Sequence, residues 1–257
     1  MTSRITKTSA LMSAIIIAAV LLAKGCKSTE HAAASQPDYD TVITNESNSG
    51  SLLVLTVKKG DAFNYPLMAV WTEDKDSGYL QTLYVPESIA TSIFRHGQAD
   101  KGKWMPGEIR RPAALPYWGH SRGVKANDGL YIPSADNPMP DAVTGATPTT
   151  DFVLKTGLDL QNKEVFTVYF EINQSWDWNE FWTNNKYPEN EAYKSSSQPA
   201  IVYAAHIDMR NLKEVYKLSP LGHSHPTGEN GLLFRDLSTL TSALRIVESA
   251  EVRIIKN

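Results

Sequence analysis

Cysteine is almost absent from this chain, because its 257 residues contain only Cys26. An intrachain disulfide, a thiolate nucleophile in the folded part and a cysteine-rich metal site are therefore excluded. The fold must be stabilised by its apolar core instead. With 42% hydrophobic residues, a chain of this length has enough material for one large domain or two small ones.

Long apolar runs are also missing, apart from one near the start of the chain. Residues 10–22 (ALMSAIIIAAVLL) follow a basic beginning with Arg4 and Lys7. Thirteen residues are too few to span a bilayer comfortably but suit the core of a signal peptide. The Ala-Lys-Gly-Cys that follows resembles a bacterial lipobox, which implies cleavage before Cys26 and lipid on its thiol. We therefore expect an exported lipoprotein of a bacterial cell envelope, periplasmic or surface-exposed, held on the membrane by its lipid.

An excess of positive charge is missing as well. The segment removed by cleavage carries three basic and no acidic residues, which leaves 22 basic against 28 acidic residues and a net charge of −6. Nucleic-acid binding needs a basic surface and is not expected. Docking on anionic lipid is disfavoured for the same reason, so membrane attachment is expected to depend on the acyl chains.

The remaining chain alternates apolar and polar residues in a way that predicts strands. Residues 26–50 are small and polar and predict a flexible tether, with the folded domain spanning 51–257. A short helix is expected near 86–94, inside a long proline-rich excursion over 86–139, and a second short helix is expected over 237–247. The fold class predicted is mostly β, an antiparallel β-sandwich. Its strands are expected at 52–57, 65–72, 79–85, 152–156, 165–172, 201–207, 215–221 and 251–255.

The sharpest short motif is Asp-Ala-Val-Thr-Gly-Ala-Thr at 141–147. One interpretation is a tight turn, in which Gly145 adopts a conformation closed to other residues and the hydroxyls of Thr144 and Thr147 cap amides. This interpretation needs no cofactor. The motif also resembles the flavinylation motif in the flavin-carrying subunit of sodium-pumping NADH:quinone reductases. That resemblance implies FMN attached to Thr147 through a phosphoester, with Asp141 and Gly145 completing the motif.

A wider resemblance includes the same motif. Residues 70–74 (VWTED), Gly78, Thr82-Leu83, Trp118 and 141–147 together resemble a family of periplasmic proteins of unknown function, often labelled by similarity to a flagellar-hook-cap domain. The resemblance covers roughly residues 65–175. It implies an immunoglobulin-like sandwich and an exported location, and it assigns no activity.

Two histidines, His223 and His225, are candidates for metal binding. On a strand, residues two apart face the same side, so both imidazoles could reach one ion, with His206, His120, Asp236 or Glu229 completing the set. Pro226 and Gly228 follow at once, however, which places the pair where a strand becomes a loop. The alternative is that the histidines only form hydrogen bonds within that loop.

An aromatic cluster is the last candidate site. Trp176, Trp178 and Trp182 lie within seven residues, together with Phe181 and the acids Asp177 and Glu180. Exposed, the rings could stack on sugars. Buried, they would close one end of the sandwich.

The function these patterns favour is non-enzymatic binding of an unidentified protein or small-molecule partner beside the membrane. One alternative is an electron carrier with FMN on Thr147. The other is a carbohydrate-binding module or a glycan-acting enzyme that uses the tryptophan cluster with Asp177 and Glu180. A glycosidase would need those two carboxyl groups about 5 to 9 Å apart across the scissile bond.

Overall fold

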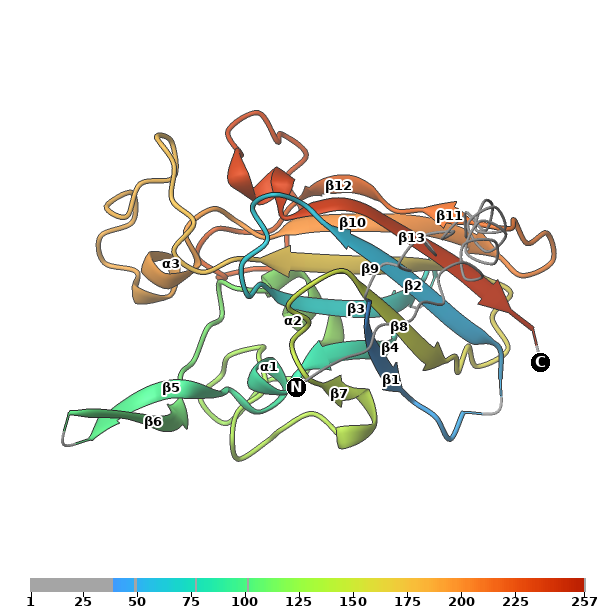
Figure 1. Ribbon diagram of the computed structural model, residues 1–257, viewed down its shortest axis with the longest axis horizontal. Helices are drawn as coiled ribbons and strands as arrows, with labels where there is room; N and C mark the ends of the chain where they lie inside the picture. Colours follow the sequence, from blue (N-terminus) through green and yellow to red (C-terminus); the bar gives the residue numbers. More distant parts are fainter. Residues whose placement is uncertain (1–38, 49, 77, 101, 257) are drawn as a thin grey trace, which may run out of the picture. The chain divides into compact units, whose positions relative to one another are not determined.

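Two β-sheets pack face to face in the computed structural model, which describes residues 39–48, 50–76, 78–100 and 102–256 (Figure 1). The described residues belong to one unit that begins at Asp38. Cys26, the predicted signal peptide and most of the predicted tether lie outside them. None of the described helices is long and apolar enough to cross a membrane.

Sheet A has five strands and sheet B has six. In spatial order, sheet A contains β1 (Asp40–Thr44), β8 (Phe152–Gly157), β2 (Leu52–Lys59), β13 (Val247–Ile255) and β11 (Tyr216–Lys217). Sheet B contains β12 (Ser219–His223), β10 (Ile201–Asp208), β9 (Val165–Asn173), β3 (Leu67–Asp74), β4 (Gly78–Pro86) and β7 (Thr144–Gly145). The predicted β-sandwich is confirmed. The sheets are mixed rather than wholly antiparallel, because β1 runs parallel to β8 and β7 runs parallel to β4.

The main core lies between the two sheets and follows the alternation read from the sequence. On β2, Leu53, Leu55 and Val57 are fully buried. On β9, the predicted apolar face is confirmed, since its four apolar residues all belong to the same buried cluster; these are Phe166, Val168, Phe170 and Ile172. Burial of such side chains is the main source of stability available to a fold without disulfides.

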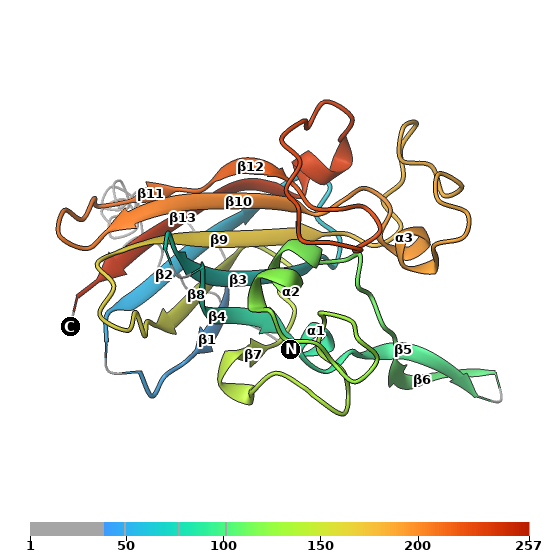
Figure 2. The same cartoon turned by 180° about the vertical axis from the view of Figure 1, so that it is seen from behind.

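A second apolar cluster covers the outer face of sheet B. Here Trp71 of β3 and Val202 of β10 pack under α1 (Glu87–Thr91) and α2 (Pro116–Arg122), which contribute Ile89 and Trp118. Figure 2 shows α2 lying over this face of the sheet. Strand β3 is therefore buried on both sides, which explains its almost uninterrupted apolar sequence.

Three parts of the fold differ from the predictions. The predicted tether contains β1, so the folded domain begins about ten residues earlier than expected. The predicted helix over 237–247 is wrong: only a 3₁₀ turn, η2 (Ser242–Arg245), forms, and β13 already begins at Val247 because that residue pairs with Lys59. The predicted strand over 215–221 is divided between β11 in sheet A and β12 in sheet B.

The proline-rich excursion is more ordered than the sequence suggests. It contains α2 and a separate two-stranded hairpin of β5 (Ile93–Asp100) and β6 (Lys103–Glu108), which projects from the sandwich (Figure 1). A further helix, α3 (Glu191–Ser196), and a 3₁₀ turn, η1 (Asp141–Val143), lie in the remaining loops.

Candidate ligand-binding site

Helix α2 is fixed on sheet B by a buried carboxylate. Glu171 of β9 accepts hydrogen bonds from the backbone N–H groups of Tyr117 (3.2 Å) and Trp118 (2.7 Å) in the first turn of the helix. These amides have no partner within the helix, so the carboxylate satisfies them. Glu171 is fully buried, and this burial raises its pKa to about 8 against the opposing effect of the hydrogen bonds.

A second carboxylate lies nearby on the same sheet face. Glu73 of β3 accepts hydrogen bonds from the indole nitrogen of Trp71 (2.8 Å) and from the hydroxyl of Ser121. The Trp71 ring stacks on Tyr169 with 5.1 Å between centroids. Residues 119–123 read Gly-His-Ser-Arg-Gly, a G-x-S-x-G pattern that was missed among the sequence motifs. In α/β-hydrolases that serine lies on a strand-to-helix turn beside a histidine. Ser121 instead lies on a helix and is bonded to a carboxylate.

The opposite side of α2 borders a cavity of about 230 Å³. The cavity lies between α2, the segment 125–132 and the loop 225–231, and we call it the α2 pocket. Its walls are mostly apolar and are formed by Pro112, Leu115, Pro116, Leu130 and Ile132. Drug-sized ligands occupy about 300 to 1,000 Å³, so this pocket suits a smaller molecule.

Arg110 holds the segment 125–132 that forms one wall of the α2 pocket. Its guanidinium donates to the Asp128 carboxylate (2.6 and 3.1 Å), to the carbonyl oxygens of Ile132 (3.0 Å) and Pro133, and to the hydroxyl of Ser92 (2.8 Å). Arg110 also holds the pKa of Asp128 below its ordinary value, mainly through the side-chain hydrogen bond. The Arg110 side chain thus forms hydrogen bonds to four residues and holds this irregular segment in place.

Glycines bring the 225–231 loop against α2 and its flanking chain. A Cβ on Gly228, which has a φ of 75°, would lie 2.3 Å from the Pro112 carbonyl oxygen. A Cβ on Gly231 would lie 2.5 Å from Cβ of His120. The loop can approach this closely only because these side chains are missing. The sequence HPTGENG therefore forms a wall of the pocket.

The polar groups of the α2 pocket are His120, Lys125, Tyr131 and Glu229. The Nε2 atom of His120 lies 3.2 Å from the Gly228 carbonyl oxygen, which can only accept, so Nε2 donates this hydrogen bond. The ring centroids of His120 and Tyr131 are 4.0 Å apart, and the Lys125 ammonium lies 4.9 Å from the Tyr131 ring. A cation, a carboxylate and an oriented imidazole therefore surround an apolar cavity.

Of the three histidines predicted as metal ligands, His206 is not brought together with His223 and His225. His223 is buried, its Nδ1 lies 2.8 Å from the Ser224 carbonyl oxygen, and its ring stacks on Phe234. His206 lies on β10 five residues beyond Ile201, the partner of His223, which is roughly 16 Å along the strand. Within the part of the chain that the structure describes, no three His, Asp, Glu or Cys side chains are placed to hold a metal ion.

His225 lies beyond the end of β12, next to the α2 pocket. Its Nδ1 is 3.0 Å from the hydroxyl of Thr227. Burial lowers its pKa, and of the two neighbours that act electrostatically Glu229 raises it and His120 lowers it further. Three residues that the sequence analysis considered for metal binding, His120, His225 and Glu229, are thus neighbours at this pocket. Nothing in the sequence identified the cavity itself, because its walls come from segments about 100 residues apart.

The 141–147 loop is a fixed turn at the edge of sheet B. Its strand β7 pairs with the end of β4, and the Tyr84 hydroxyl donates to the Ala146 carbonyl oxygen (2.6 Å). A Cβ on Gly145 would lie 3.1 Å from Val42 and 3.3 Å from the Tyr84 ring. The glycine therefore favours close packing here and does not adopt an unusual φ, which corrects the expected reason.

The two threonines of this loop also differ from expectation. The Thr144 hydroxyl donates to the Asp141 carbonyl oxygen (3.1 Å) instead of capping an amide. Thr147 is half-buried, and among the described residues its hydroxyl has no hydrogen-bond partner. Asp141 is exposed in η1.

The tryptophan cluster is divided between core and surface. Trp182 is only 5% exposed, belongs to the main core, and donates from Nε1 to the Thr239 hydroxyl (3.2 Å). It therefore cannot contribute to the expected ligand-binding surface. Trp176 and Trp178 are exposed and contact each other edge to face. Asp177 turns inward and accepts from the Ser242 hydroxyl, so it anchors the loop instead of facing a sugar with Glu180.

No family model matches the chain, and no match is found among curated proteins or solved structures. Function must therefore be argued from the site, since a sandwich fold alone assigns none.

Proposed function

We propose that this chain is a lipid-anchored binding protein of the cell envelope, whose ligand is a small organic molecule in the α2 pocket. The observation that carries the proposal is the cavity of about 230 Å³, which combines apolar walls with a few converging polar groups. Ligand sites typically have this composition. The anchor at Cys26 is inferred from the sequence alone.

The polar groups suggest the class of ligand. Lys125 would pair with a carboxylate, and Glu229 would accept from an amine or a hydroxyl. The rings of His120 and Tyr131, which pack against each other at an angle of 33°, would contact the body of the molecule. A small amino acid or hydroxy acid has these groups, so we propose this class.

Binding without catalysis is supported by the arrangement of the polar side chains. The hydroxyl of Ser121 donates to Glu73 and forms no hydrogen bond to any histidine of the described residues. His120, one residue earlier, bonds to a backbone carbonyl instead. A nucleophile paired with a general base is needed for acyl-transfer chemistry, and these residues do not form that pair.

Ligand-observed NMR with a panel of small amino and hydroxy acids tests this proposal on the full-length protein. At least one compound should bind to the wild type and lose its signal when Leu130→Trp fills the α2 pocket. Leu232→Trp is the matched control, because Leu232 is exposed and outside the pocket lining. Binding that persists in Leu130→Trp, or no binding by any compound, would contradict the proposal.

A second candidate is an electron carrier with FMN on Thr147, and the loop geometry favours it in one respect. The backbone of the turn is held by the Tyr84 hydroxyl and by pairing with β4. The Thr147 hydroxyl is partly exposed and has no hydrogen-bond partner among the described residues. Such a hydroxyl is free to form a phosphoester, and the bound flavin would supply electron transfer. Thr147 would hold the group, and the exposed Asp141 could contact the transferase that attaches it.

Intact mass and in-gel fluorescence test this candidate, using protein produced in the periplasm with an active flavin transferase. A mass increase equal to FMN less water, lost in Thr147→Ala but kept in Thr149→Ala, would support it. An unmodified mass in the wild type would rule it out.

A further inference from the structure

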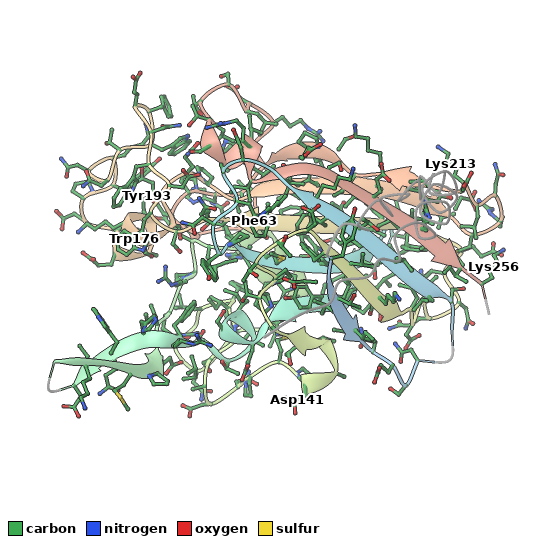
Figure 3. All side chains as sticks on the ribbon, viewed as in Figure 1. Phe63, Asp141, Trp176, Tyr193, Lys213 and Lys256 are labelled. Carbon is green, nitrogen blue, oxygen red and sulfur yellow. The ribbon has the colours of Figure 1, made fainter. Side chains whose placement is uncertain are left out.

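Exposed aromatic and apolar side chains gather on two projecting segments. The β5–β6 arm (residues 93–108) presents Trp104, which is 68% exposed, beside Met105. The loop 174–190 presents Trp176, which is 61% exposed, together with Trp178 and Phe181. Both segments project from the same end of the sandwich, and Figure 3 labels Trp176 there (Figures 1 and 3). We call these five residues the aromatic end.

The strand register shows that the chain enters the fold at this end. Asp40, the first residue of β1, pairs with Phe152, which in turn pairs with Val57 near the end of β2. The chain then turns into β3, whose first residue Leu67 pairs with Asn173 just before the loop 174–190. The C-terminal residue of β13, Ile255, pairs with Leu52 at the opposite end.

The β5–β6 arm has no buried face of its own. Most of its described residues are exposed, and an isolated two-stranded hairpin is only marginally stable in water. Trp104 and Met105 are consecutive on β6 and so point to opposite faces of the arm. A groove or a single partner surface would cover only one of these faces. A layer into which the arm inserts would surround both.

The aromatic end carries both basic and acidic side chains, and the tryptophans and the basic side chains fit a lipid interface. Tryptophan prefers the boundary between headgroups and acyl chains. Arg95 and Lys103 on the arm and Lys186 beside Phe181 have long side chains that can reach the headgroups from such a position. Of the three acids of the loop, Asp177 is turned toward Ser242, whereas Glu180 and Glu189 are exposed, as are Asp100 and Glu108 on the arm.

We propose that the aromatic end of this protein inserts into the headgroup layer of the membrane that carries its anchor. The inference rests on the proposed lipid at Cys26. From Cys26 to Asp40 the chain can extend at most roughly 50 Å, which keeps the end where it enters the fold close to the bilayer. Because the processed chain is acidic, insertion should depend on the aromatic residues and should not require anionic lipid.

Quenching by brominated lipid tests the insertion. The full-length protein is reconstituted into phosphatidylcholine vesicles with or without bromine on the acyl chains, and the vesicle-bound fraction is isolated by flotation. The chain has six tryptophans, of which Trp71, Trp118 and Trp182 are buried. Bromine should therefore quench mainly the other three. Quenching should fall in Trp104→Phe and almost disappear when Trp176→Phe and Trp178→Phe are added.

Ile255→Trp is the matched control, because it adds an exposed tryptophan at the opposite end, next to Lys256 in Figure 3. Its added emission should not be quenched. Floating protein without quenching, or quenching unchanged in the triple variant, would overturn the proposal. So would light scattering that finds a dimer dissociated by the same substitutions, because the aromatic end would then bind a second copy.

The anchor is tested separately by intact mass. If the mass shows no lipid, the same chain carrying an N-terminal hexahistidine tag is bound to vesicles with nickel-chelating lipid, and the quenching is measured again. Quenching there would support insertion even though the anchor proposal had failed. No quenching there would overturn insertion as well.

Discussion

Replacing Glu171 with glutamine should remove a pH dependence of stability. In the folded protein, burial raises the pKa of Glu171 to about 8, whereas in the unfolded chain it is near 4.5. Between pH 4.5 and pH 8, Glu171 is therefore protonated in the folded protein and ionised in the unfolded chain. The protonated carboxyl therefore contributes stability that is fully present below about pH 4.5 and is lost as the pH rises through 8.

The magnitude follows from the two pKa values. A difference of 3.5 pKa units corresponds to about 5 kcal/mol at most, since one unit is about 1.4 kcal/mol. About 4 kcal/mol of this falls between pH 5 and pH 8.5. Glutamine is neutral throughout, although its NH₂ group cannot accept a hydrogen bond. One of the two backbone amides, that of Tyr117 or of Trp118, therefore loses its partner, which costs about 1 to 3 kcal/mol at every pH.

Urea unfolding of the wild type and Glu171→Gln at several pH values measures this effect. The free energy of unfolding of the wild type should fall relative to that of the variant by a few kcal/mol from pH 5 to pH 8.5. His223 and His225, whose pKa values burial lowers, titrate in both proteins and cancel in the difference. Two parallel pH profiles would refute the reasoning, because Glu171 would then keep the same charge in both states.

Three further predictions concern packing and the pocket wall. Gly145→Ala should lower stability by about 1 kcal/mol because its Cβ meets Val42 and Tyr84, and an unchanged Tm would contradict this. Trp182→Ala should cost about 3 to 5 kcal/mol in urea unfolding, while exposed Trp176→Ala should stay within about 0.5 kcal/mol; similar losses would refute the core assignment. Arg110→Ala should speed amide hydrogen exchange over 128–133 but not over β9, and unaltered exchange would disprove its role in the wall.

The strands that the sequence predicted are those with a buried face. On β2 and β9 the apolar residues alternate, and this pattern is a local property of the chain. Strand β1 was missed because it is short and pairs in parallel with β8, so no hairpin turn marks it. The β5–β6 arm was missed because it buries neither face and thus has no alternation.

The helix predicted over 237–247 does not form, because tertiary contacts hold this segment in another conformation. The spacing of its apolar residues is helical, but Leu240, Ala243 and Ile246 reach the core from an irregular segment. The amide of Thr241 donates to Gln198 at 2.8 Å, which fixes that segment against a distant loop. Contacts of this kind override local preference.

The α2 pocket could not be predicted from spacing. His120, Tyr131 and Gly228 meet only because α2 and the 225–231 loop pack on the same face of sheet B. The pairing of His223 with His225 rested on a strand period of two, and β12 ends at His223. The period therefore did not apply to the second histidine.

The parallel pairing of β1 with β8 has a mechanical consequence. The chain enters the fold at Asp40, where its amide donates to Asp151 (2.8 Å) and its carboxylate accepts from Thr149 (3.0 Å). From Asp40 to Thr44, β1 is hydrogen-bonded along β8. A pull along the axis of β1 from its first residue shears these bonds, so they bear the load together instead of opening one at a time. The fold therefore resists force applied through the chain before Asp40 more strongly than it would if the β1–β8 hydrogen bonds opened one at a time.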